Sequence, residues 1–104
     1  MEYSDFALAF KAMSDEKRLK IIDMLSDGSL CACEILKQFD FTQPALSQHM
    51  KVLVDGGLVS GIRVGNWMHY SLDKERYDEI ISFVKQISSE YKDDLCREEY
   101  AKCK

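Results

Sequence analysis

The sequence predicts a mainly α-helical fold with one small β-hairpin. Apolar residues recur at helical spacing in four segments before residue 57, and capping residues or glycines separate these segments. Gly65-Asn66 then joins two short runs rich in β-branched and aromatic residues, a signal for a two-residue hairpin. A long amphipathic segment follows. Four helices, a hairpin and a final helix are the element order of a winged helix-turn-helix, so the fold class is α+β.

The first two predicted helices are short and amphipathic. Phe6 and Phe10 belong to an apolar stripe at helical spacing over residues 6–13. Ser14 is expected to cap a second helix whose first turn contains Asp15, because hydroxyls cap well and carboxylates suit the helix dipole there. Asp27-Gly28 ends it.

The third and fourth helices form the predicted helix-turn-helix pair. Ser29 is expected to cap a helix over residues 30–39, and Thr42 a fourth that runs to Gly56-Gly57. Pro44, the single proline, falls in the first turn of this fourth helix, where a missing N–H costs little.

The last predicted helix begins after Asp73 and carries a coiled-coil-like seam. The seam residues are spaced 3-4-3-4, namely Tyr77, Ile80, Val84, Ile87 and Tyr91. We therefore expect one winged helix-turn-helix domain over residues 1–91. Its hairpin consists of strands over residues 58–63 and 67–72. Residues 92–104 are expected to form a charged tail that could include a short helix.

Size and charge set the first limits on function. A chain of 104 residues is one domain and gains stability from self-association. The net charge of −4 counts against nucleic acid as a partner, but residues 41–72 contain Lys51 and Arg63 against Asp55 alone. With no long apolar run and no basic leader at the start, we expect a cytoplasmic chain without membrane contact. In that compartment, cysteines more often bind metal or react than form structural disulfides.

The fourth helix is the candidate DNA-reading element. With Leu46, Met50 and Leu53 facing inward, its outward residues are Gln43, Ser47, Gln48 and Lys51. These side chains suit base edges and phosphates. Contacts to the DNA backbone or minor groove are expected from Thr42, Arg63 and Asn66, while His49 suits either packing or phosphate. A merely solvated helix face is the alternative.

Cys31 and Cys33 lie at the predicted start of the third helix. On a regular helix, residues i and i+2 point about 200° apart. Binding one ion through both sulfurs should therefore unwind this first turn and disturb the recognition helix. The helix N-terminus favours the thiolate that binds metal.

Four motifs in order resemble the ArsR/SmtB family of metal-responsive repressors, and in particular its arsenic-responsive type. They are residues 12–19, the Leu30-Cys31-Ala32-Cys33-Glu34 metal box, the recognition segment 42–53, and the wing at residues 56–59 and 65–72. The resemblance spans about residues 6–90. It implies a homodimer on an imperfectly palindromic operator in double-stranded DNA. The first and last helices would form the interface, through Phe6, Phe10 and the seam.

The resemblance also narrows the inducer. Some arsenic-responsive members carry a third cysteine where this chain has Leu36, so a third sulfur must come from Cys96 or Cys103 of either subunit. Sulfur ligands with no His close by favour soft ions. The family's zinc sites use Asp and His pairs on the last helix, and residues 77–91 contain no His. We expect As(III) or Sb(III), with Cd(II) or Pb(II) as alternatives and no organic cofactor.

The sequence leaves two other functions open. A redox sensor would bridge Cys33 and Cys96 by a disulfide or polysulfide. A metal-sequestering or protein-interaction module would use the winged fold without DNA. An enzyme is not expected, since neither a Ser/His/Asp set nor a phosphate-binding glycine loop is present.

Overall fold

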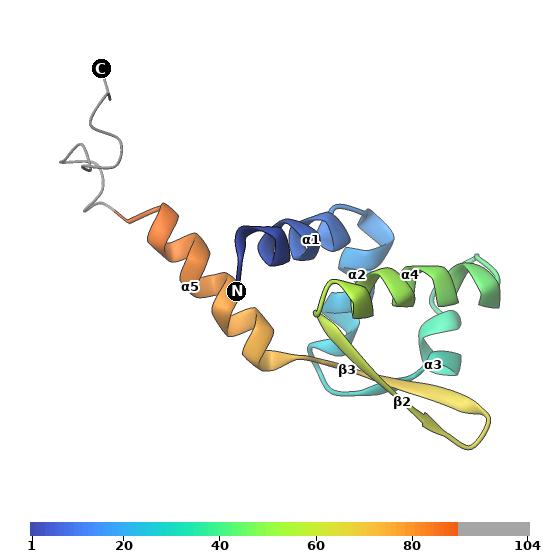
Figure 1. Cartoon of the computed structure of the whole chain (residues 1–104). Helices are drawn as coiled ribbons and strands as arrows, with labels where there is room; N and C mark the ends of the chain where they lie inside the picture. The colour runs from blue at the N-terminus through green and yellow to red at the C-terminus, as the bar shows by residue number, and fades with distance from the viewer. Residues whose placement is uncertain (90–104) are drawn as a thin grey trace.

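Five α-helices and a three-stranded antiparallel sheet build residues 1–89, the part of the chain that the computed structural model describes (Figure 1). The elements are α1 (Tyr3–Met13), α2 (Glu16–Leu25), β1 (Leu30–Cys31), α3 (Ala32–Leu36), α4 (Gln43–Asp55), β2 (Val59–Val64), β3 (Trp67–Leu72) and α5 (Lys74–Ile87). This order confirms the predicted winged helix-turn-helix. The predicted tail lies outside the described residues.

The cap of α2 differs from the prediction. Asp15 is the N-cap, and its carboxylate accepts hydrogen bonds from the backbone N–H groups of Lys17 at 2.8 Å and Arg18 at 3.1 Å. Ser14 instead ends α1, where its hydroxyl donates to the Lys11 carbonyl. Of two adjacent residues that can cap, the carboxylate takes the helix start because it also suits the positive end of the helix dipole.

The start of α3 also differs. The predicted helix over residues 30–39 with Ser29 as its cap is wrong at both ends, because Leu30 and Cys31 form β1 and the helix ends at Leu36. Cys31 is the N-cap, with extended backbone angles φ −72° and ψ 145°. The first helix of the pair is therefore five residues long and begins directly after a strand.

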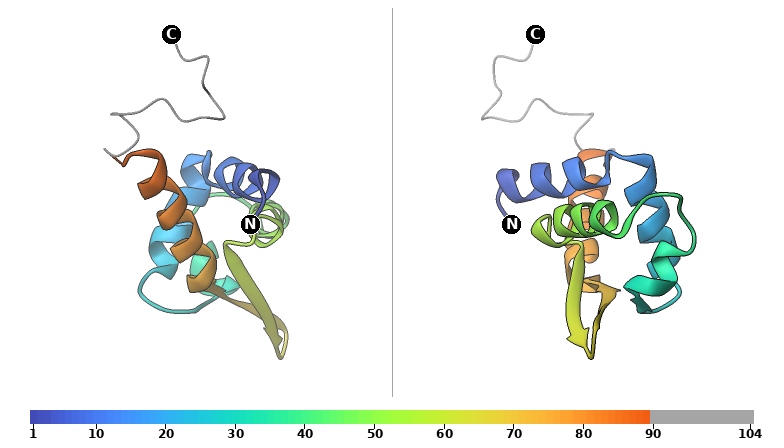
Figure 2. Two further views of the ribbon diagram at one scale, coloured as in Figure 1. Left: turned by 60° about the vertical axis from the view of Figure 1, so that its left-hand side comes forward. Right: turned by 90° about the vertical axis from the view of Figure 1, so that its right-hand side faces the viewer.

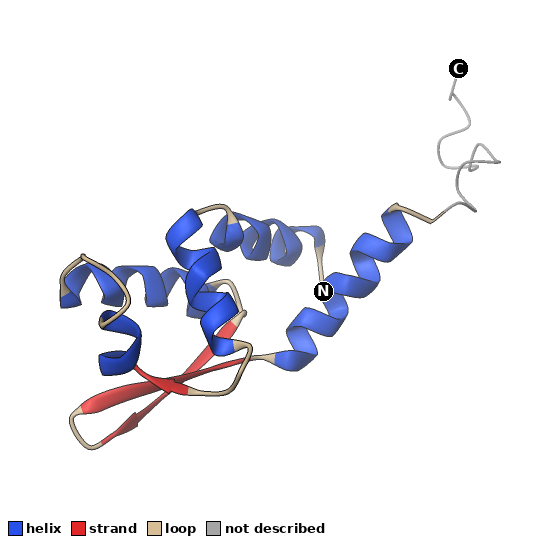
Figure 3. Cartoon of the chain, turned by 180° about the vertical axis from the view of Figure 1, so that it is seen from behind, coloured by secondary structure: helices blue, strands red, loops and turns tan. Residues whose placement is uncertain are grey.

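The sheet has the order β1-β3-β2, so β3 is its central strand (Figure 3). The hairpin turns at Gly65-Asn66 as predicted, and Gly65 has φ +63°, a left-handed conformation that favours glycine. Strand β1 was not predicted, since two residues leave no alternation to detect. It pairs Leu30 with Tyr70 and Cys31 with His69.

The hydrophobic core lies where α2, α3 and α4 meet the base of the sheet. Its largest fully buried side chains are Ile21, Ile35, Met50, Leu53 and Leu58. The hairpin tip and α5 project from opposite ends of this body (Figures 1 and 2). The part of the fold that can reach a DNA groove is thus separated from the long last helix.

Candidate DNA-reading surface and cysteine site

Helix α4 presents one buried and one exposed face, as predicted. Thr42 caps it through a hydrogen bond from the Ala45 N–H at 3.3 Å, and Pro44 lies in the first turn. Leu46, Met50 and Leu53 are buried. The exposed face carries the predicted reading residues, Gln43, Ser47, Gln48 and Lys51. Amide and hydroxyl groups on one open helix face are what direct base reading requires.

Lys51 forms an ion pair with Asp55 on this face, with 3.1 Å between Nζ and the carboxylate. Both side chains are well exposed, so water screens the pair and it adds little stability. Lys51 can therefore exchange Asp55 for a phosphate at small cost. Arg63 and Asn66 are exposed on the hairpin.

His49 is half-buried on the flank of α4. Its Nδ1 lies 3.3 Å from an Arg18 guanidinium nitrogen, and its ring centroid is 5.3 Å from that of Phe41. Sequence reasoning missed Arg18, although an arginine shortly after a helix end is a usual partner for that helix's last carbonyls.

The two cysteine sulfurs meet at the start of α3 and are joined as a disulfide, with the Cα atoms 5.2 Å apart. The expectation that they point apart on a helix is wrong, because Cys31 precedes the helix in an extended conformation. Its sulfur accepts the Cys33 N–H at 3.3 Å, and Glu34 accepts the Cys31 N–H at 2.8 Å. Both sulfurs can thus face one ion without unwinding of α3.

His69 is a neighbour of the cysteines that sequence reasoning missed. It is the antiparallel partner of Cys31, and directly opposite residues present their side chains on the same face of a sheet. The premise that no His lies nearby is therefore wrong. Cys31 itself is 7% exposed. Within residues 1–89, no three His, Cys, Asp or Glu side chains form a group that can hold a metal ion.

The predicted third ligands, Cys96 and Cys103, lie outside the described residues, as does Tyr91 of the seam.

The rest of the seam is divided between two faces of α5. Ile80 is buried in the core and Tyr77 packs against it, whereas Val84 and Ile87 are 45% and 59% exposed. Two inward and two outward residues do not form one continuous seam. Burial raises the pKa of Tyr77 to about 12, and its hydroxyl has no hydrogen-bond partner among the described residues.

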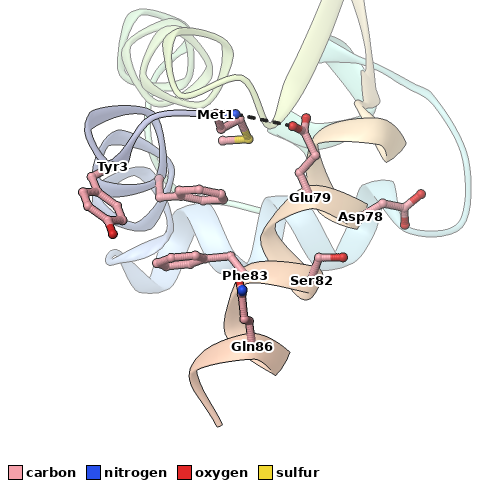
Figure 4. Close-up of a pocket in the computed structure, with 8 residues that line it drawn as sticks. Met1, Tyr3, Asp78, Glu79, Ser82, Phe83 and Gln86 are labelled. Atoms are coloured by element: carbon pink, nitrogen blue, oxygen red, sulfur yellow. Dashed lines mark ion pairs between the residues drawn. The ribbon is translucent and has the colours of Figure 1, made fainter. Parts of the chain in front are cut away.

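Phe83 joins α5 to α1. Its ring stacks on that of Phe6 at a centroid distance of 4.1 Å, and the rings of Tyr3 and Phe10 each lie 6.4 Å away. An open groove of about 510 Å³ runs beside this cluster (Figure 4). The Met1 ammonium lies 3.9 Å from the Glu79 carboxylate across it.

A family model described as "Bacterial regulatory protein, arsR family" matches residues 15–60, from the cap of α2 into β2. The chain is 41% identical over 97 residues to the arsenical resistance operon repressor of Staphylococcus aureus, and 93% of each chain is covered. The chain belongs to the ArsR family. It is 48% identical over 80 residues to the repressor of the same name from Staphylococcus xylosus, with 77% of each chain covered.

The ArsR fold is also found in a solution structure from Mycobacterium bovis, a homodimeric winged helix-turn-helix domain of a possible ArsR-family regulator. The TM-score is 0.67 at 23% identity, with 90% of this chain and 87% of that chain covered. Membership of the ArsR family makes this chain a DNA-binding transcriptional repressor rather than an enzyme. None of the helices in residues 1–89 has the length and apolar composition that a membrane crossing requires.

Proposed function

We propose that this ArsR repressor controls an arsenical resistance operon and leaves its operator when As(III) or Sb(III) binds the reduced Cys31/Cys33 pair. The observation that carries the proposal is the meeting of the two sulfurs at the cap of α3. Two thiolates on one side of a helix start are a soft, chelating donor set. The names of the two staphylococcal relatives support the same inducer.

The route from ion to DNA runs through two elements that share Cys31. This residue caps α3, which leads into the turn before α4, and it also pairs with His69 in the wing strand β3. An ion that pulls on the Cys31 sulfur acts on the cap and on the strand together. Release then needs only a small shift of α3 and the wing, and no unwinding of the helix.

A third sulfur completes the site in this proposal, since the position one turn after Cys33 is Leu36. Cys96 or Cys103, from the same or the partner subunit, supplies it. If both contribute, four sulfurs suit Cd(II) or Pb(II) instead.

Operator reading is assigned to α4 in the major groove. Gln43, Ser47 and Gln48 meet base edges, while phosphate contacts come from Thr42, Lys51, Arg63 and Asn66. The acidic body makes sequence-independent affinity weak, because few cations face the phosphates.

The proposed dimer forms through α1 and α5, and the M. bovis domain that shares this fold is described as homodimeric. The surface consists of exposed apolar side chains of both helices, namely Phe10, Ile81, Val84 and Ile87. Phe6, Tyr77 and Ile80 of the same two helices are buried or partly buried in the core. Sedimentation equilibrium checks this surface: Val84→Glu should yield monomers, while Ile62→Glu on the exposed wing should leave dimers.

Fluorescence anisotropy of reduced protein on labelled DNA tests the inducer. A duplex selected by the chain from a randomised library serves as the operator. As(III) should release the parent, and Cys31→Ser and Cys33→Ser should bind DNA but stay bound. Release of either variant at the parent's As(III) concentration would contradict the site. Titrations with Sb(III), Cd(II), Pb(II) and Zn(II), repeated on Cys96→Ser and Cys103→Ser, identify the ion and the third sulfur.

A thiol-redox repressor is the second candidate, because the sulfurs of Cys31 and Cys33 lie close enough to bridge. In this candidate the bridge would join Cys33 to Cys31, since Cys96, the partner suggested by the sequence, lies outside the described residues. Thiol counting by mass spectrometry after mild oxidation, with DNA affinity measured on the same sample, distinguishes the two functions. Loss of DNA binding on oxidation, with no response to As(III), would favour the redox repressor.

A further inference from the structure

The Arg18 side chain connects three elements at the corner between α1 and α2. Its Nε donates to the Ala12 carbonyl at 2.7 Å, and one terminal nitrogen reaches the Lys11 carbonyl at 3.5 Å. The other terminal nitrogen lies 3.3 Å from Nδ1 of His49 on α4. The guanidinium thus rests on the last carbonyls of α1, where a cation is favoured.

The backbone of Arg18 is held as firmly as its side chain. Its N–H donates to the carboxylate of Asp15, and this bond is the main reason that the pKa of Asp15 lies below its ordinary value. A charged Asp15 therefore stands at the same corner. The Asp15 cap holds the backbone of Arg18, and the Lys11 and Ala12 carbonyls hold its side chain. Together these contacts fix the direction of the guanidinium.

This contact favours one tautomer of the His49 imidazole. A guanidinium can only donate hydrogen bonds, so Nδ1 must accept. In this arrangement Nε2 is the ring nitrogen that carries the proton and can donate. Phe41 packs against the ring at 5.3 Å, so the direction of Nε2 is limited as well.

His49 is placed to use that proton on DNA. It directly follows the exposed Gln48 and precedes the buried Met50, so it lies on the flank of α4 between the reading face and the core. When a recognition helix lies in the major groove, its flanks are nearest the phosphates.

We propose that Arg18 is a positioning residue for operator binding: it holds His49 as the Nε2–H tautomer, which donates to a DNA phosphate. The inference rests on the proposed function, since it requires α4 to read DNA. Arg18 itself does not touch the DNA.

Two readouts test the positioning role on the full chain. In ¹⁵N-labelled protein, long-range ¹H–¹⁵N correlation spectra should show His49 with an unprotonated Nδ1 and a protonated Nε2. Arg18→Met should give a mixture of tautomers. A parent spectrum with the proton on Nδ1 would overturn the inference without any variant.

The second readout is a double-mutant cycle in DNA affinity on the selected duplex. His49→Asn keeps an acceptor near the Nδ1 position and removes the Nε2–H group that is proposed to donate to the phosphate. The affinity for DNA should therefore fall about tenfold, the effect of one hydrogen bond to a charged group. Arg18→Met should weaken binding severalfold in the parent and not at all in the His49→Asn background. An equal loss in both backgrounds would indicate a merely structural arginine.

Salt dependence separates positioning from direct contact. In this role His49 contributes one hydrogen bond through Nε2–H and Arg18 does not touch the DNA, so neither variant should change the slope of log affinity against log salt. A slope reduced by about 0.9 in Arg18→Met would mean that Arg18 itself neutralises a phosphate, and this would refute the assignment. Urea unfolding confirms that each variant is folded. If the parent shows no salt-dependent DNA binding, the proposed function fails; if the parent binds and His49→Asn binds equally, only the present inference fails.

Discussion

Phe83→Ala should detach α5 from α1 at a cost that the ring contacts allow one to work out. Phe83 is half-buried, so truncation loses about half of a full phenylalanine burial, roughly 1–1.5 kcal/mol. The stack on Phe6 at 4.1 Å adds about 0.5–1.5 kcal/mol. The two rings at 6.4 Å lie at the outer limit of aromatic contact and add less. The expected loss is about 1.5–3 kcal/mol.

Urea unfolding followed by circular dichroism measures this loss, at one high protomer concentration so that self-association contributes equally to each protein. A loss near 2 kcal/mol corresponds to a fall in Tm of about 10 °C for a domain of this size. Phe83→Leu keeps most of the buried area and loses the ring stacking, so it should cost about 1 kcal/mol. Ile62→Ala on the exposed wing is the matched control and should change the stability little.

Two results would refute this reasoning. If Phe83→Leu cost as much as Phe83→Ala, the aromatic geometry would carry the whole effect and the burial argument would be wrong. If Phe83→Ala matched the control, the last helix would be held by Tyr77 and Ile80 alone.

Four further predictions concern stability. Tyr77→Phe should stabilise the fold by about 1 kcal/mol, because it removes a buried hydroxyl without a partner in the described residues; thermal unfolding of the variant, with Tyr3→Phe as the exposed control, checks it. The raised pKa of Tyr77 means that the folded state keeps a proton that the unfolded state loses as the pH rises. The stability of the parent should therefore fall by on the order of 1 kcal/mol between about pH 10 and 12, after discounting for partial exposure. A pH series in which the stability of Tyr77→Phe falls as steeply would contradict this. Asp15→Ala should lower the free energy of unfolding by about 0.5–2 kcal/mol, while Asp15→Asn keeps the cap. Because the pKa of Asp15 is lowered in the folded state, the stability of the parent over Asp15→Ala should disappear as the pH falls below the ordinary carboxyl range. Equal urea midpoints for the Ala and Asn variants would refute the cap. Gly56→Ala should cost about 1–2 kcal/mol, since the new methyl would lie 3.0 Å from the Ala12 methyl and 3.4 Å from the Leu8 carbonyl oxygen. This overpacking outweighs the stabilisation that comes from a less flexible unfolded chain. A stabilised variant in the same assay would show that α1 and α4 can separate freely.

The elements with a strong period could be predicted from the sequence. The inward face of α4 and the Gly65-Asn66 turn were predicted correctly, because three buried residues at helical spacing and a two-residue turn signal are local properties. The start of α3 was not. There, Ser29 and Cys31 compete as caps, and pairing of Leu30 with Tyr70, forty residues away in the sequence, decides the outcome.

The candidate sites show the same division. The exposed polar residues of α4 follow from the period of its buried face. The approach of the two sulfurs, the position of His69 opposite Cys31, and the bond between Arg18 and His49 all depend on tertiary contacts that no spacing encodes. The seam failed for a related reason. A 3-4-3-4 spacing does not say whether a helix packs on its own domain or on a second one. In α5, Ile80 is buried in its own domain, whereas Val84 and Ile87 are exposed.

Because Cys31 belongs to a strand and also caps a helix, the proposed coupling between ion and DNA must act in both directions. Whatever free energy an ion at Cys31 and Cys33 removes from operator binding, the bound operator removes equally from ion binding. DNA that holds α3 and the wing in place would thus lower the affinity of the thiolates for As(III). Repressor free in solution would take up the ion first, and the operator-bound fraction would respond only at higher concentrations. The shared cysteine would in this way give the switch a threshold.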